Sequence, residues 1–465
     1  MKQLLAYCLS IILCVSFTGC MENYLDLYPE DKITSASFPE NESDIKLLLN
    51  GVYAQLREKE VYNQGLFGFG ITDGATPNAF NWGTDEVFNK LGAGRLSSSD
   101  GGVVTYRWKR CYEIISRANY LLACMDLVDL SEEAKAKYSG ETHFLRGLAY
   151  SVLAETYGGV PIILTNISTE EARSLKRASL EETWQQALDD YEVAITNLGV
   201  DAPEPGRATK GAALGMKMRA YLYQGKYKEV LACVEQIDAL KKYGLFHSYE
   251  GLFDPANENN KEVLFDIQYI EGENSQGSYI DQYCGTGTGS WTRGSRYVPT
   301  DDLVAAYETI DGSPVDPENP YENRDPRLGF TAVLPGSYFL GYRFPNYLYP
   351  GGAFNHAGNR LKHLSTRKYR IQDESKLPPS GQSYINDIIL RYADVLLSKA
   401  EAIIETNGNV ADAIAILNRI RTERDDVKIS LLPTSMSREE AREMKVASIV
   451  ALLHPFVILV GTALA

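Results

Sequence analysis

Two segments of the chain combine aromatic side chains with carboxylates, amides and arginines. A sugar ring offers a flat apolar face that stacks on aromatic rings, and hydroxyl groups that pair with amides, carboxylates and guanidinium groups. These two segments are therefore the candidate sugar-contacting regions, with the alternative that their tryptophans anchor loops in the core. The first segment carries Asp73, Asn78, Asn81, Trp82 and Asp85, and the second carries Tyr283, Trp291, Arg293 and Arg296.

Motifs for catalysis are missing from the sequence. It contains no His-Glu-x-x-His, no Gly-x-Ser-x-Gly and no Gly-x-x-x-x-Gly-Lys-Ser/Thr. Gly285, Gly287 and Gly289 are spaced like a phosphate loop, but no strand precedes them and no helix follows, so they indicate a flexible loop. Glycoside hydrolysis needs two positioned carboxylates, and nothing singles out one pair among 61 acidic residues. We therefore name no catalytic residue, no metal ligand and no cofactor.

The first twenty residues have the pattern of a secretory signal. Lys2 is the only charge before an apolar run over residues 4–17, and small residues precede Cys20. The apolar run is shorter than the roughly 20 residues that a membrane-spanning helix requires. Residues 17–20 (FTGC) are similar to a bacterial lipobox, although Phe17 stands where Leu is usual. We predict a lipoprotein signal at 1–19 and an acylated Cys20 (palmitate), with a plain secretory signal as the alternative.

The net charge of the chain excludes nucleic acid as a partner. The formal net charge is −15 at pH 7, and removal of the signal with Lys2 makes it more negative. Such a chain repels nucleic acid, so we predict no nucleic-acid partner.

The cysteines are not placed to form a local disulfide. Cys111 and Cys124 are expected on one helix, about 20 Å apart, which is too far for a disulfide. We predict buried, reduced thiols.

Helical periodicity dominates the sequence outside two irregular stretches. Residues 61–103 lack periodicity and are predicted to be a long loop region, and residues 243–390 are rich in Gly and aromatics, with a short strand expected near 262–269. We interpret the second stretch as an ordered, irregular subdomain that carries function on a helical scaffold. Amphipathic helices are predicted over residues 44–58, 105–126, 131–156, 179–198, 208–224, 226–240 and within 391–424.

Two helix pairs share a spacing that resembles tetratricopeptide repeats. Gly225 is followed by Tyr227, Val230, Val234 and Ile237. The same intervals separate Gly408, Val410, Ala413, Leu417 and Ile420. A glycine suits the tight turn between the helices, and the later positions pack the second helix on the first. Because the copies are 183 residues apart, a large insertion separates the repeats.

Seven short motifs together resemble the SusD/RagB family of outer-membrane glycan-capture lipoproteins. They occur in the family's order over nearly the whole chain. The motifs are residues 23–26 (NYLD), 49–53 (LNGVY), 117–121 (RANYL), 140–147 (GETHFLRG), 157–161 (YGGVP), 323–328 (NRDPRL) and 391–397 (RYADVLL).

The resemblance implies a mainly α fold, with about four tetratricopeptide-like helix pairs, few short strands and a large loop-rich region that builds the ligand site. It also implies a surface-exposed, lipid-anchored protein of the outer membrane that hands oligosaccharide or polysaccharide to a SusC-like TonB-dependent transporter. In the family, aromatics that contact the ligand come from loops in the two regions named above. The expected division is 1–19 signal, 20–242 N-terminal helical region, 243–445 C-terminal region with the insertion, and 446–465 tail.

Several family positions are interpreted as structural. Arg391 and Asp394 lie three residues apart on a scaffold helix and can pair, and Glu401 follows on the same helix. His143 lies inside a helical motif and is also expected to be structural. The aromatic cluster at residues 338–349 is a candidate transporter interface, because Tyr and Phe are enriched in interface cores.

The tail does not follow the family. Residues 446–465 contain no Asp, Glu, Lys or Arg, and His454-Pro455 would disrupt a spanning helix. We favour a frameshift or early stop over a spanning or buried helix, because composition changes where the family motif ends.

The leading function is glycan capture without catalysis. Peptide capture, a protein-only helical scaffold and a hydrolase with an unrecognised carboxylate pair are the alternatives.

Overall fold

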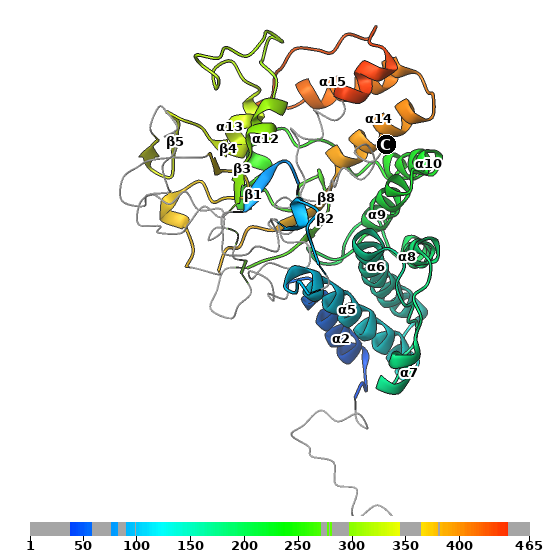
Figure 1. Cartoon of the computed structure of the whole chain (residues 1–465). Coiled ribbons are helices and arrows are strands. Elements are labelled where there is room, and N and C mark those ends of the chain that lie inside the picture. The colour runs from blue at the N-terminus through cyan, green and yellow to red at the C-terminus, as the bar shows by residue number, and fades with distance from the viewer. Residues whose placement is uncertain are drawn as a thin grey trace, which may run out of the picture.

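The computed structural model describes residues 38–57, 76–81, 90–97, 99–270, 277–278, 280, 297–344, 364–379 and 382–444. Within these residues the fold is mainly helical, as predicted. Figure 1 shows α2 and α5 to α10 along one side of the molecule, and the short strands β3, β4 and β5 with α12 and α13 on the other. No helix among the described residues has the length and apolar character needed to cross a membrane.

The predicted helices are confirmed, with ends shifted by a few residues. α6 begins after the predicted polar cap, since the Ser131 hydroxyl accepts a hydrogen bond from the amide of Ala134. The predicted stop is Gly158, which has a φ of 74°. The helices are α2 (Glu42–Ala54), α5 (Val103–Met125), α6 (Glu132–Tyr157), α7 (Thr169–Ser174), α8 (Leu180–Asn197), α9 (Lys210–Tyr223), α10 (Tyr227–Ala239), α14 (Tyr392–Glu405) and α15 (Val410–Thr422).

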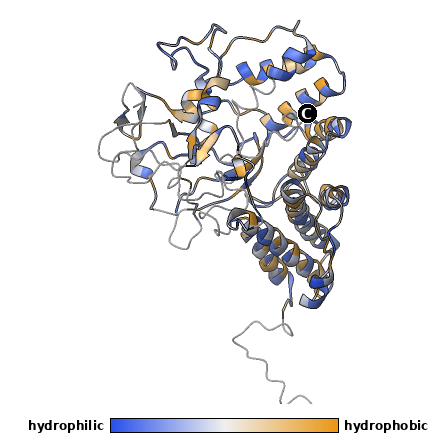
Figure 2. Ribbon diagram, in the orientation of Figure 1, coloured by the Kyte–Doolittle hydropathy of each residue, from blue (hydrophilic) through white to orange (hydrophobic). Residues whose placement is uncertain are grey.

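Successive helices pack on one another and form one array. α5 packs on α6, α6 on α8, α8 on α9, and α9 on α10. α14 and α15 resume the array, because α14 packs directly on α10. The insertion that separates the two repeats in the sequence is therefore looped out, and the array is continuous in space. Figure 2 shows hydrophobic and hydrophilic positions interleaved along these helices, as amphipathic packing requires.

The turns of the two matched helix pairs differ by one detail. Gly225 has a φ of 66°, as the predicted tight turn requires. In the second pair the left-handed residue is Asn407, with a φ of 58°, and not Gly408. Gly408 is needed for space instead, since a Cβ there would lie 3.0 Å from Ile403 Cγ2. The spacing predicted the packing of both pairs correctly and the turn residue of only one.

Short antiparallel strand pairs organise the loop-rich region. The predicted strand near 262–269 is β2 (Val263–Ile267), which pairs with β8 (Asp387–Arg391) directly before α14. β4 (Ala332–Val333) pairs with β7 (Ser365–Thr366), and β5 (Tyr338–Phe339) pairs with β6 (Tyr342–Arg343). The remaining elements are α12 (Asp301–Ala306), α13 (Pro326–Thr331), and the 3₁₀ turns η2 (Gly251–Phe253), η3 (Pro255–Asn257) and η4 (Glu374–Lys376).

The prediction of a long loop region over residues 61–103 is incomplete, because it includes no strand. β1 (Ala79–Asn81) lies inside it and pairs with β3 (Tyr297–Pro299). A three-residue strand has no periodicity to read, and its partner lies more than 200 residues away. Only the tertiary fold reveals this strand.

Candidate functional site

Most of the predicted sugar-contacting residues lie outside the described residues. Asn78 is described, with its side chain 6% exposed, and Asn81 is described as a strand position. Burial favours a loop-anchoring role for Asn78, whose carbonyl accepts a hydrogen bond from the Thr300 amide at 3.0 Å. The residues outside the described ranges are Asp73, Trp82, Asp85, Tyr283, Trp291, Arg293, Arg296 and the predicted lipidation residue Cys20.

The β1–β3 ribbon brings the ends of the two predicted segments together. In the antiparallel register, Asn81 lies opposite Tyr297, and Phe80 lies opposite Val298. Trp82 follows Asn81 in the chain, and Arg296 precedes Tyr297. Both segments therefore join the ribbon at the same end. A side-chain bond from the Thr300 hydroxyl to the Pro77 carbonyl ties the other end.

A cavity of about 500 Å³, here called the loop cavity, lies among residues of the loop-rich region. Its apolar lining includes Tyr269, Ile270 and Tyr384. Tyr384 directly follows the isolated bridge between Ser278 and Ser383, which holds the chain leading toward Tyr283. Glu258, Gln372, Asp373 and Lys376 add polar groups to the lining. Aromatic and polar side chains together are the lining that sugar binding needs.

A cluster of carboxylic acids and amides extends from the wall of the loop cavity, where Glu258 lies, to the buried Asp266. The Asn386 amide N–H donates to Glu258 Oε1 at 2.8 Å, and its side-chain nitrogen donates to Asp266 Oδ2 at 3.1 Å. Gln268 also donates to Asp266, at 2.7 Å. Burial raises the pKa of Glu258 to about 7 and that of Asp266 to about 6. The cluster can thus change its charge near neutral pH.

Family motifs on the helices form a buried structural network. Arg146 of α6 holds Asp190 of α8 through three hydrogen bonds of 2.7 to 3.2 Å, and donates to the Asn119 side chain of α5 at 2.8 Å. Asn119 in turn donates to the carbonyls of Ile163 and Thr165. These polar residues join three helices and the following loop, so they stabilise the array.

Arg391 is also buried, in agreement with the structural interpretation, but its guanidinium reaches a partner that the sequence did not indicate. It binds Glu262 Oε1 at 3.2 Å, and Arg424 binds the same oxygen at 2.7 Å. The Asp394 carboxylate accepts a hydrogen bond from the backbone amide of Arg391 at 3.0 Å. Glu262 lies more than 120 residues from either arginine, so helical spacing could not reveal the contact.

Potential reactive groups within the described residues are tied into the core. Cys111, Cys124 and Cys233 are buried free thiols, and burial raises the pKa of Cys111 to about 12. His143 is half-buried with its Nδ1 at 2.8 Å from the Ser139 carbonyl. No group of three or more His, Cys, Asp or Glu side chains could hold a metal ion in this part of the chain.

The sequence analysis missed the functional candidates that lie on β2 and beside it. Glu258, Asp266 and Asn386 belong to segments without motif spacing, and they meet only when β2 pairs with β8. An acid within the apolar run of residues 263–267 was the one available signal, because a buried carboxylate in a strand needs partners.

Two family models match the chain in succession. The model of the SusD family matches residues 261–427. The model described as "Starch-binding associating with outer membrane" matches residues 23–222.

Curated proteins and solved structures agree with these models. SusD-like protein P25 of Formosa agariphila is 26% identical over 90% of this chain and 81% of its own length. The crystal structure of a SusD-like carbohydrate-binding protein of Bacteroides fragilis superposes with a TM-score of 0.76 at 25% identity, covering 88% of this chain and 84% of that one. A laminarin-binding SusD-like protein shares the fold with a TM-score of 0.66 at 20% identity, covering 88% and 90%.

A separate short match has a different character. Over 26 residues, 6% of this chain, the sequence is 92% identical to the potassium-binding subunit of a potassium-transporting ATPase of Phocaeicola vulgatus. The match covers 5% of that protein, so it carries no argument about activity.

Proposed function

The chain belongs to the SusD/RagB family, and we propose that it binds an oligosaccharide or polysaccharide at the cell surface without cleaving it. The observation that carries the proposal is the β1–β3 ribbon, because it joins the two segments that hold the candidate aromatic and polar residues. Trp82 and Trp291 are assigned to stack on sugar rings, and the carboxylates, amides and arginines around them are assigned to the hydroxyl groups.

The partners and location follow from the same family membership. Cys20 would carry the lipid that holds the chain at the outer membrane, and a SusC-like TonB-dependent transporter would receive the glycan. The match to a family described as associating with the outer membrane supports this location. The proposed division places most of the helical scaffold in residues 20–242, and the last helix pair with most of the ligand-binding region in residues 243–445.

Gel retardation tests glycan capture directly. The mature chain is run on native gels that contain starch, laminarin or xyloglucan. Retardation by one polysaccharide, with no release of reducing ends, is the expected result. Reducing ends would identify a hydrolase. A folded chain that no polysaccharide retards would favour peptide capture or a protein-only scaffold.

Substitution of the two tryptophans tests the assigned residues. Trp82→Ala and Trp291→Ala should each weaken retardation about tenfold or more, because one stacked aromatic ring contributes on the order of 1–2 kcal/mol. Tyr338→Ala is the control, since Tyr338 is an aromatic residue that is 68% exposed on β5 and outside both segments. Equal retardation of all three variants would remove Trp82 and Trp291 from the site.

The uncharged tail has its own proposed origin. We infer that the 26-residue match to the ATPase subunit includes this 20-residue tail, because a stretch free of charged side chains suits an integral membrane protein. Joined genes are then an alternative to the frameshift that composition alone suggested. Genomic sequencing downstream of the codon for residue 465 separates them. Further ATPase-subunit sequence supports joining, and a SusD-type segment in another frame contradicts it.

A further inference from the structure

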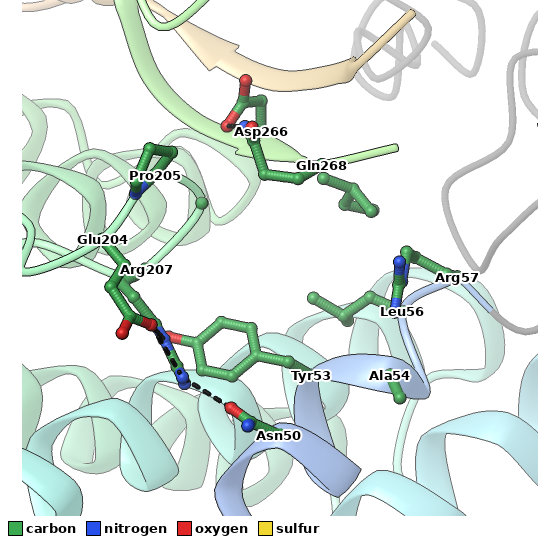
Figure 3. A pocket seen from close by; sticks show the side chains of 12 residues that line it. Asn50, Tyr53, Ala54, Leu56, Arg57, Glu204, Pro205, Arg207, Asp266 and Gln268 are labelled. Atoms are coloured by element: carbon green, nitrogen blue, oxygen red, sulfur yellow. Dashed lines mark hydrogen bonds and ion pairs between the residues drawn. The ribbon is translucent and has the colours of Figure 1, made fainter. Parts of the chain in front are cut away.

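A second cavity, here called the scaffold cavity, lies between the helix array and the loop-rich region. It has a volume of about 340 Å³ and is lined by the last turn of α2, residues 204–207 and the end of β2. Figure 3 shows the open space between Tyr53 and Leu56 on one side and Asp266 and Gln268 on the other. This volume is within the range of small-molecule sites and holds one or two sugar rings.

The lining combines an aromatic ring with hydrogen-bonding side chains. Tyr53, Leu56 and Pro205 supply apolar surface, and Asn50 and Gln268 supply amide groups. Figure 3 shows these side chains arriving from three different segments of the chain. Such a lining complements a pyranose, which has an apolar face and a rim of hydroxyl groups.

The aromatic ring is held in place before any ligand binds. The Tyr53 hydroxyl donates to Glu141 Oε2 at 2.7 Å and accepts from the Ala208 amide at 2.9 Å. The Arg207 guanidinium lies 4.8 Å from the centre of the ring. Burial, together with the negative charge of Glu141, raises the pKa of Tyr53 well above its ordinary value, so the phenol stays neutral. A fixed ring loses little conformational entropy when a sugar stacks on it.

Two of the cations at the cavity, Arg207 and Lys46, are paired with carboxylates. Arg207 contacts Glu204 at 3.3 Å and Glu141 at 3.5 Å, and Lys46 contacts Glu204 at 2.6 Å. Asp266 accepts hydrogen bonds from two amide side chains. The described contacts pair these cations with anions, so the lining favours a neutral ligand over a uronate, a phosphate or a metal cation.

The loop of residues 204–207, which forms one wall of the cavity, passes close to the Gln268 side chain. Gly206 has a φ of 78°, and a Cβ there would lie 2.4 Å from Gln268 Cγ. A further cavity of about 460 Å³ shares this loop and Asp266 in its lining. The two cavities therefore share residues 204–207 and Asp266 as part of their walls.

We propose that the scaffold cavity is a second saccharide site, which takes a neutral sugar unit and is built on Tyr53, Asn50 and Gln268. The proposal rests on the proposed function, since it assumes that the protein binds glycan. It adds a site on the helical scaffold, distinct from the segments that the β1–β3 ribbon joins.

Counting bound trisaccharide tests this inference. The mature chain is dialysed to equilibrium against labelled maltotriose, laminaritriose or a xyloglucan trisaccharide, whichever matches the polysaccharide that retards it on gels. Ala54→Trp fills the cavity, because Ala54 lines it at the partly exposed end of α2. Ala232→Trp is the matched control, since Ala232 is exposed on α10 and lines none of the cavities described above. Unfolding curves confirm that both variants fold.

The expected counts are two trisaccharides per chain for wild type and the control, and one for Ala54→Trp. Gln268→Leu should weaken the same site about tenfold, because it removes the amide and keeps the shape. The Trp82→Ala/Trp291→Ala double variant should retain one trisaccharide, and adding Ala54→Trp should abolish it. A wild-type count of one that Ala54→Trp leaves unchanged overturns the second site and leaves glycan capture intact. No binding of any glycan, on gels or in dialysis, overturns both.

Discussion

Buried polar groups are handled differently in the helical scaffold and beside the two cavities. In the scaffold, Arg146 and Asp190 neutralise each other through a bidentate contact, with side chains only 7% and 2% exposed. Beside the cavities, Asp266 and Glu258 are held by amide groups in the contacts described above, and burial raises the pKa of both. The scaffold cancels its charges to fix helix positions, whereas the cavity side keeps acids that can gain a proton near neutral pH.

Substitution of Glu262 should have the largest effect on stability. Glu262 lies directly before β2 in the loop-rich region, and its two partners, Arg391 and Arg424, flank the helix pair α14–α15. Its side chain is fully buried and holds both Arg391 and Arg424. Glu262→Gln should lower the free energy of unfolding by about 4 kcal/mol, since it removes the buried anion that two buried guanidinium groups share. Urea unfolding followed by circular dichroism measures this loss. A loss below about 1 kcal/mol would show that the two arginines do not depend on Glu262.

Asp190→Ala should be the next largest effect. It leaves Arg146 buried without its carboxylate, at a cost of about 3 kcal/mol. Asp126→Ala is the control, because Asp126 pairs with Lys135 on the surface, and it should change the unfolding curve little. Retardation by glycan should be unchanged in the folded fraction of both variants. Equal stability of the two variants would contradict the comparison.

Asp266→Asn should give the smallest effect, and one that depends on pH. With a pKa near 6 in the folded chain and about 4 unfolded, Asp266 binds more protons when folded, so its contribution to stability falls as pH rises from 4 to 6. Above pH 6 the ionised acid is destabilising by less than about 3 kcal/mol, since one pKa unit corresponds to about 1.4 kcal/mol. The asparagine variant should therefore be more stable than wild type at pH 8 and not at pH 4.

Unfolding curves at both pH values provide the measurement for Asp266→Asn. Glu258→Gln is the companion variant and should flatten the pH dependence further, because Glu258 titrates near pH 7 and is raised in part by Asp266. A wild-type stability that rises between pH 5 and 8 by the amount that Asp266→Asn abolishes would refute the raised pKa.

The helices were predictable because their signals are local. An apolar residue recurs every three or four positions, a polar cap such as Ser131 begins a helix and Gly158 ends one, and each signal lies within one turn of its effect. Even so, the turn before α15 used Asn407 where spacing pointed to Gly408. The two residues are neighbours and contribute to the turn differently: Asn407 adopts the left-handed conformation, and Gly408 leaves space beside Ile403.

The sequence by itself determined the mainly helical array, the burial of the three described thiols and the two segments that hold sugar-binding residue types. The tertiary structure alone decided that Asn81 lies opposite Tyr297, that Glu262 binds both Arg391 and Arg424, and that Tyr53 faces Gln268 across a cavity. Each of these contacts joins residues more than 120 positions apart. Their pairing follows from chain closure and packing, which leave no periodic trace in the sequence.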